Sequence, residues 1–86
     1  MKTIKFKSNK NNYPVEESDL KNNTVRFTSD WDDKRWDKFR NATHIEIESR
    51  DKGRKFKREI RHKCEYGAII IITWEPLASK TEEMPK

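Results

Sequence analysis

The stretch Gly67-Ala68-Ile69-Ile70-Ile71-Ile72-Thr73-Trp74 decides the fold, because it places four consecutive isoleucines in a chain of which 41% is charged. Consecutive β-branched side chains crowd a helix and fit the pleat of a strand. Successive strand residues point to opposite faces, so Ile69 and Ile71 share one face and Ile70 and Ile72 the other. Both faces are apolar, which predicts a strand that is covered on both sides.

Four more segments alternate between apolar and polar residues and are predicted to be strands. They are the segments 2–7, 24–28, 43–49 and 54–64. In the second of them, Val25 and Phe27 are expected to face the core. In the last, Phe56, Ile60 and Cys64 are expected to share the inner face.

The two strands at 43–49 and 54–64 are predicted to form a hairpin around Gly53, which is suited to a turn with positive φ. Keeping apolar residues on one face predicts a register that opposes Ile45 to Ile60 and Glu48 to Lys57. This register also places the polar side chains of Arg58 and His62 on the inner face.

One helix is predicted from about Ser29, its expected N-cap, to Asn41. Trp31, Arg35 and Phe39 recur at four-residue spacing and define its apolar stripe. The helix is expected to cover one face of the isoleucine strand. Either the segment 9–23, which holds a short helical turn after Pro14, covers the other face, or a second copy does so in a homodimer.

The predicted fold class is α+β. It is a small, mostly antiparallel sheet of about five strands, in the chain order β-β-α-β-β-β, with one helix packed on one face. One domain is expected over residues 1–76, followed by a flexible C-terminal tail over 77–86.

Composition points to the cytoplasm. The single cysteine, Cys64, excludes an intramolecular disulfide and fits a reducing compartment. The N-terminal residues have no apolar signal-peptide core, and no apolar run is long enough to cross a bilayer, so no membrane partner is expected.

Positive charge is concentrated in the segment 50–63, which holds eight basic residues against two acidic ones, or +6, while the whole chain carries +5. A basic hairpin of this kind favours contact with the phosphates of DNA or RNA. The main functional prediction is therefore a small non-enzymatic nucleic-acid-binding protein. Its predicted contact residues are Arg50, Lys52, Arg54, Lys55, Lys57, Arg58, Arg61 and Lys63. The structural explanation for the same cations is simple pairing with Glu46, Glu48 and Glu59.

Two other functions compete with this prediction. In the first, the protein is an inhibitor or adaptor of the kind that phages use, and it docks on an acidic surface of a partner enzyme. Its partner-binding residues would be Trp36, expected to be exposed, and the adjacent Arg35.

The second is an RNase-type toxin, in which His44 and His62 would act with Arg58 or Arg61. Because a structural zinc site needs four ligands and His62 and Cys64 supply two, no metal or other cofactor is expected.

Overall fold

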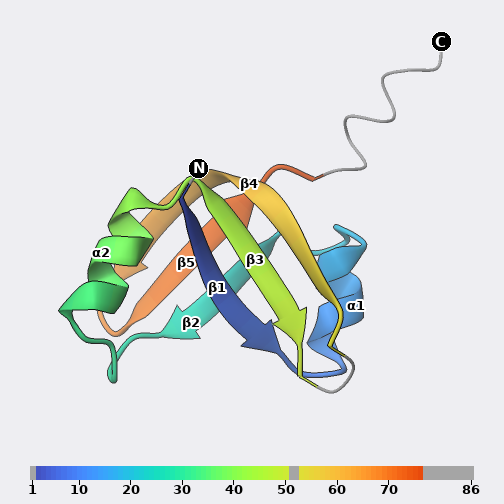
Figure 1. Cartoon of the computed structure of the whole chain (residues 1–86), viewed down its shortest axis with the longest axis horizontal. Coiled ribbons are helices and arrows are strands. Elements are labelled where there is room, and N and C mark those ends of the chain that lie inside the picture. The colour runs from blue at the N-terminus through green and yellow to red at the C-terminus, as the bar shows by residue number, and fades with distance from the viewer. Residues whose placement is uncertain (1, 51–52, 77–86) are drawn as a thin grey trace, which may run out of the picture.

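Five strands and two helices make up the structure, a computed structural model that describes residues 2–50 and 53–76 (Figure 1). In chain order they are β1 (Thr3–Ser8), α1 (Asn12–Glu17), β2 (Asn23–Phe27), α2 (Asp33–Asn41), β3 (His44–Ser49), β4 (Lys55–Tyr66) and β5 (Ile69–Trp74). The tail predicted over 77–86 lies outside the described residues.

The five strands form one mixed sheet with the spatial order β1-β3-β4-β5-β2. β1 pairs with β3 in parallel, and the other three pairings are antiparallel. The predicted α+β class with a mostly antiparallel five-stranded sheet is therefore confirmed. The structure adds α1 as a second helix where a short helical turn was expected.

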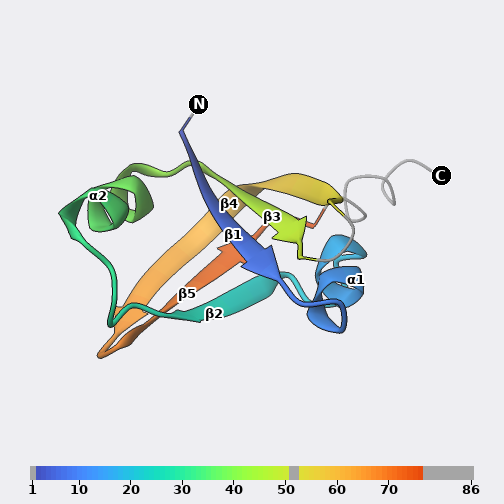
Figure 2. The same ribbon diagram turned by 60° about the horizontal axis from the view of Figure 1, so that its bottom comes forward.

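The long strand β4 takes part in both halves of the sheet. Its residues up to Glu59 pair with β3, and those from Ile60 onward pair with β5, with a β-bulge at Arg61 between them. Bulges bend a strand and increase its twist. The sheet curls at this point, so that β1 and β3 cross over β5 and β2 (Figure 2).

The core lies between the two halves of the curled sheet. Ile45 and Ile47 from β3 are fully buried, as are Ile70, Ile72 and Trp74 from β5. The two helices lie at opposite ends of the molecule (Figures 1 and 2). Their buried contributions to the core are Tyr13 from α1 and Phe39 from α2. The expected packing of a helix on a face of the isoleucine strand is not confirmed.

The start of α2 differs from the prediction. Asp32, rather than Ser29, is the N-cap, and its Oδ1 accepts a hydrogen bond from the backbone N–H of Arg35 at 2.9 Å. Both residue types cap helices well, so composition alone could not choose between them.

The bulge in β4 reverses the predicted faces beyond it. Cys64 pairs with Ile71 on the outer face of the sheet, although it was expected beside Phe56 in the core. Lys63 pairs with the fully buried Ile72 and so lies on the inner face. An extra residue in a strand shifts the alternation by one, and strict alternation therefore mispredicted both residues. His62 was expected on the inner face for the same reason, but it pairs with Thr73 on the outer face.

The predicted orientation of β2 is also wrong. Val25 and Phe27 point outward and are 49% and 76% exposed, whereas Thr24 is buried. Arg26 shares the inner side with Thr24 and donates from Nε to Thr24 Oγ1 at 2.9 Å. Arg26 lies on the inner side because its side chain reaches across to acceptors on β1. A prediction from hydrophobicity alone cannot anticipate such a contact.

The hairpin register is shifted by two residues from the prediction. Glu46 opposes Lys57, Ile47 opposes Phe56 and Glu48 opposes Lys55. A shift of two keeps the side chains before the bulge on their expected faces, so the inward position of Arg58 is confirmed. Arg58, rather than Ile60, opposes Ile45.

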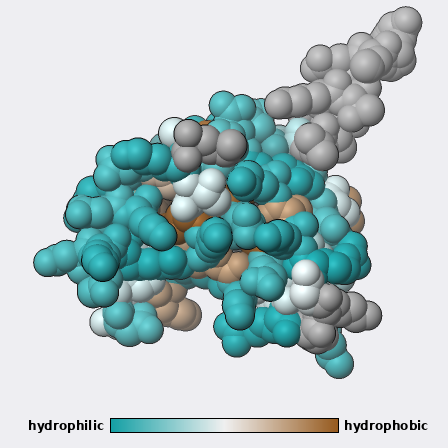
Figure 3. Space-filling model, in the orientation of Figure 1, coloured by the Kyte–Doolittle hydropathy of each residue, from teal (hydrophilic) through white to brown (hydrophobic). Residues whose placement is uncertain are grey.

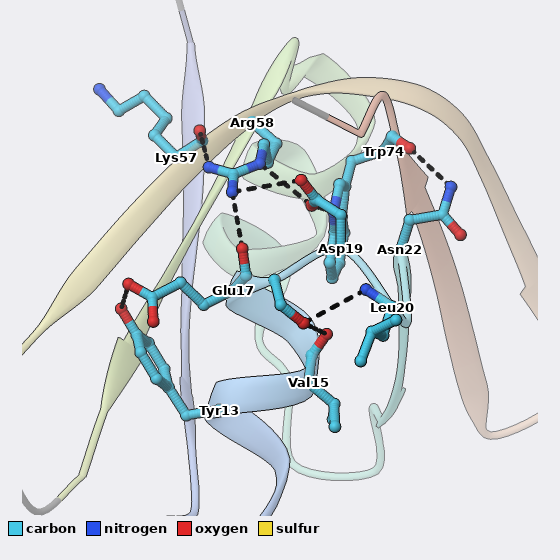
Figure 4. Close-up of polar contacts among 10 residues, drawn as sticks. Tyr13, Val15, Glu17, Asp19, Leu20, Asn22, Lys57, Arg58 and Trp74 are labelled. Atoms are coloured by element: carbon cyan, nitrogen blue, oxygen red, sulfur yellow. Dashed lines mark hydrogen bonds and ion pairs between the residues drawn. The ribbon is translucent and has the colours of Figure 1, made fainter. Parts of the chain in front are cut away.

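A buried ion pair explains how the core accepts Arg58 (Figure 4). Arg58 Nε donates to Asp19 Oδ1 at 3.2 Å, and the two side chains are 9% and 4% exposed. Asp19 Oδ1 also accepts from Trp74 Nε1 at 3.1 Å, and Arg58 Nη2 donates to the Glu17 carbonyl at 2.9 Å. This network fastens the segment after α1 to β4 and β5.

Candidate binding groove

Most cations of the predicted basic hairpin are held by partners within the chain. Arg58 pairs with buried Asp19, as described above. Arg54 pairs with Glu17 and lies over the Tyr13 ring, with its guanidinium carbon 5.5 Å from the ring centroid. Lys55 forms an ion pair with Glu46 at 3.9 Å.

Arg61 makes a two-pronged contact with Glu75, through hydrogen bonds of 2.8 and 3.0 Å. These hydrogen bonds raise the pKa of Arg61.

Lys63 stabilises the end of α2. Its Nζ donates to the carbonyl oxygens of Phe39, Arg40 and Ala42 at 2.7, 2.8 and 3.0 Å. The last carbonyls of a helix have no partner within the helix and carry partial negative charge. Lys63 therefore acts as a C-terminal cap, and burial lowers its pKa.

Arg50 and Lys57 are exposed, and Lys52 lies outside the described residues. On the outer face of β1, β3 and β4, Glu46 lies between Lys5 and Lys57, and Glu48 lies between Lys7 and Lys55. This surface is mostly hydrophilic in Figure 3. Four lysines against two glutamates leave it with +2.

A groove of about 670 Å³ lies along β1 and β2, the two edges of the curled sheet. Its charged lining consists of Lys5, Lys7, Arg26, Arg35 and Arg50 against Asp30, Glu46 and Glu48. Five cations against three carboxylates give it a net charge of +2. Its aromatic lining consists of Phe6, Phe27 and Trp31. We call this feature the seam groove.

Arg26 spans the seam groove from β2 to β1. Its Nη1 donates to the Lys7 carbonyl at 2.8 Å, and its Nη2 donates to Ser8 Oγ at 3.0 Å. Ser8 Oγ in turn donates to Oε1 of buried Glu16 at 2.6 Å. Glu16, which attracts Arg26 electrostatically, is thus linked to it by way of the Ser8 hydroxyl.

Arg35 approaches the same edge of β1 from α2. Its Nη2 donates to the Lys5 carbonyl at 2.6 Å. The guanidinium carbons of Arg35 and Arg26 lie 4.7 and 4.9 Å from the centroid of the Phe6 ring. Arg35 also lies 5.4 Å from the centre of Trp31.

Carboxylates act on Arg26 and Arg35 only from beyond direct contact, Glu16 on Arg26 and Asp30 and Asp32 on Arg35. Within residues 2–50 and 53–76, neither guanidinium forms an ion pair or a hydrogen bond with a carboxylate, and their acceptors are carbonyl and hydroxyl oxygens. Burial lowers the pKa of both side chains. Guanidinium groups that keep free N–H donors in a partly desolvated groove suit an anionic ligand.

Trp36 is half-buried rather than exposed. Its ring centroid lies 4.9 Å from that of Trp31 and 5.9 Å from that of Phe39, in an aromatic cluster against the core. Of the two predicted partner-binding residues, Arg35 thus lines the seam groove. Trp36 does not line it but packs against Trp31, which does.

Sequence reasoning missed the part that β1 and β2 play in the groove. Lys5 and Lys7 read as the ordinary solvent face of a strand, and Arg26 read as the outward residue between two apolar ones. A parallel β1–β3 pairing, which brings these residues beside Arg50, leaves no local signal in the sequence.

The residues of the proposed RNase site do not all share one face of the sheet. His44 and His62 lie on outward-facing positions, opposite Glu59 and Thr73, whereas Arg58 points inward. No described contact joins the two histidines. The described residues also contain no cluster of three or more His, Cys, Asp or Glu side chains suited to a metal ion.

Comparisons identify no relative of this chain: no family model, curated protein or solved structure matches it. Neither helix in the described part has the length and apolar character needed to cross a membrane.

Proposed function

We propose that this protein is a small non-enzymatic nucleic-acid-binding protein, and that the seam groove, rather than the hairpin alone, binds the nucleic acid. The main observation in support of this proposal is that Arg26 and Arg35 line the groove without a direct carboxylate partner. Lys5, Lys7 and Arg50 add charge along the same groove.

The aromatic lining favours single-stranded nucleic acid. Proteins that bind single strands combine a cationic groove with aromatic side chains on which bases stack. Phe27 is 76% exposed at the border of the groove, and Trp31 is half-buried within it. A base could stack on Phe27 while the phosphates meet the arginines.

The competing candidate is an acidic segment of a partner protein, which the same cations would also attract. It is favoured by the exposed backbone edge of β2, where an extended peptide could pair. Thr28 N–H donates to the carbonyl of Ala68, just before β5, and the Asn22 carbonyl accepts from Trp74 N–H. The intervening odd-numbered residues of β2 therefore direct their backbone groups to the free edge. The carboxylates of an acidic segment make no use of the exposed Phe27 ring, whereas every nucleic-acid base can stack on it, and we therefore favour nucleic acid.

Replacing two groove lysines should weaken binding strongly. In the variant Lys5→Gln/Lys7→Gln, we expect the affinity for single-stranded oligonucleotides to fall roughly tenfold or more, and the slope of log affinity against log salt to fall by about 2. Fluorescence anisotropy with single- and double-stranded DNA and RNA across a salt series measures both quantities.

Two variants with the same change of net charge serve as controls. Lys34→Gln/Lys38→Gln, on α2 and outside the groove, should bind almost as tightly as the unmodified protein. Lys55→Gln/Lys57→Gln tests the hairpin alone and should have a smaller effect than the groove variant. Equal losses in all three would show a non-specific charge effect, and no binding at low salt would overturn the proposal in favour of an acidic protein partner.

A further inference from the structure

The outer face formed by β5, β2 and the second half of β4 is free of charged side chains. Strand pairing arranges nine outward positions in three rows. The rows are Asn23–Thr73–His62, Val25–Ile71–Cys64 and Phe27–Ile69–Tyr66. Not one of the nine is lysine, arginine, aspartate or glutamate, in a chain that is 41% charged. We call this surface the uncharged face.

The apolar members of this face are accessible. Phe27 and Tyr66 are 76% and 69% exposed, and Val25 is 49% exposed. Ile69, Ile71 and Cys64 are partly exposed between them. An accessible apolar patch rimmed by polar residues marks an interaction surface.

The other half of the same sheet shows how unusual this face is. Three rows of outward positions on β1, β3 and the first half of β4 can be compared directly. They are Thr3–His44–Glu59, Lys5–Glu46–Lys57 and Lys7–Glu48–Lys55. Seven of these nine residues are charged. The outer face of one half of the sheet thus carries many charged side chains, whereas the nine outward positions of the other half carry none.

We infer that the uncharged face binds the same face of a second copy of this chain. The inner faces of Ile70 and Ile72 are buried in the core, while the outer faces of Ile69 and Ile71 have no covering element among the described residues. A strand that is apolar on both faces is typical of a position covered on both sides.

A second copy is the occupant that matches in charge. Two-fold stacking places uncharged rows against uncharged rows, so none of the nine outward side chains loses the hydration of a charge. The outer face of the other half of the sheet is charged and would lose such hydration. From strand and residue spacings the face measures about 15 Å by 20 Å. This area is small for a protein interface and predicts a dimer that dissociates on dilution.

Self-association should depend on the apolar side chains of this face. Sedimentation equilibrium over a concentration series should show a reversible shift from the monomer mass of 10.4 kDa to twice that value. Tyr66→Lys and Ile71→Lys should each weaken dimerisation about tenfold or more. Val25 and Phe27 are avoided as test sites because they also border the seam groove.

Leu20→Lys is the matched control. Leu20 is 84% exposed and lies outside the uncharged face, so this change also replaces an exposed apolar side chain by a cation. It should leave dimerisation unchanged. Circular dichroism of each variant confirms that it remains folded.

The single cysteine gives an independent measurement. Cys64 lies in the central row, so its alkylation rate should fall as the concentration of unmodified protein rises, and should not fall in Tyr66→Lys. Added salt should strengthen the dimer because it screens repulsion between two copies of net charge +5. This response is opposite to that of nucleic-acid binding, so the two proposals fail separately.

Either of two results would overturn the inference. A monomer at every concentration and salt would show that copies do not associate through this face. Protection of Cys64 that is independent of concentration would show that another part of the same chain covers it.

Discussion

Replacing Arg58 by methionine is expected to destabilise the protein by about 3–5 kcal/mol, because it leaves the buried carboxylate of Asp19 without its cation. A small domain has a total stability of roughly 5–15 kcal/mol, so this loss would unfold a large fraction of the molecules near body temperature. Urea denaturation followed by tryptophan fluorescence measures the change, since Trp74 belongs to the same network.

The double variant Arg58→Met/Asp19→Asn distinguishes an unpaired charge from lost packing. Asparagine keeps an oxygen acceptor for Trp74 Nε1, and it tolerates the positive φ of 66° at this position. The double variant should recover part of the stability lost in the single one. Arg61→Met, which breaks an exposed pair, is the control and should have little effect. A double variant no more stable than Arg58→Met would contradict this explanation.

Replacing Lys63 by methionine is expected to cost about 2–3 kcal/mol, because three carbonyl oxygens at the end of α2 lose a charged donor. Methionine keeps most of the aliphatic length, so the loss reports on the ammonium group. Thermal or urea unfolding gives the magnitude, and far-ultraviolet circular dichroism reports on the helix.

Lys57→Met is the matched control for this prediction. Lys57 lies on the same strand but points to solvent, and its replacement should change the stability by less than about 0.5 kcal/mol. If both variants were equally stable, the capping role of Lys63 would be wrong. Oligonucleotide affinity should follow neither change closely, because neither residue lines the seam groove.

The isoleucine run predicted the centre of the fold correctly, because β-branched residues restrict the backbone locally. Ile70 and Ile72 are buried, and the strand lies inside the sheet. The α+β class and the hairpin between β3 and β4 followed from alternation in the same way. Local patterns were sufficient wherever neighbouring residues alone determined the structure.

Errors arose where a distant partner determined the position of a residue. Arg26 faces inward because β1 offers it acceptors, and Lys63 faces inward because a bulge turns it toward the end of α2. Neither partner is close in sequence. The predicted binding site was incomplete for the same reason. The sequence shows that positive charge is concentrated between Arg50 and Lys63, but it does not show that Arg58 and Arg61 are paired with Asp19 and Glu75.

The most direct test of the proposed function is a nuclear magnetic resonance titration of the labelled protein with a short single-stranded oligonucleotide. We expect the amide shifts to concentrate along β1 and β2, and the guanidinium Nε–H signals of Arg26 and Arg35 to move as well. Changes confined to Lys55 and Lys57, or no changes at all, would contradict the assignment of the seam groove as the binding site.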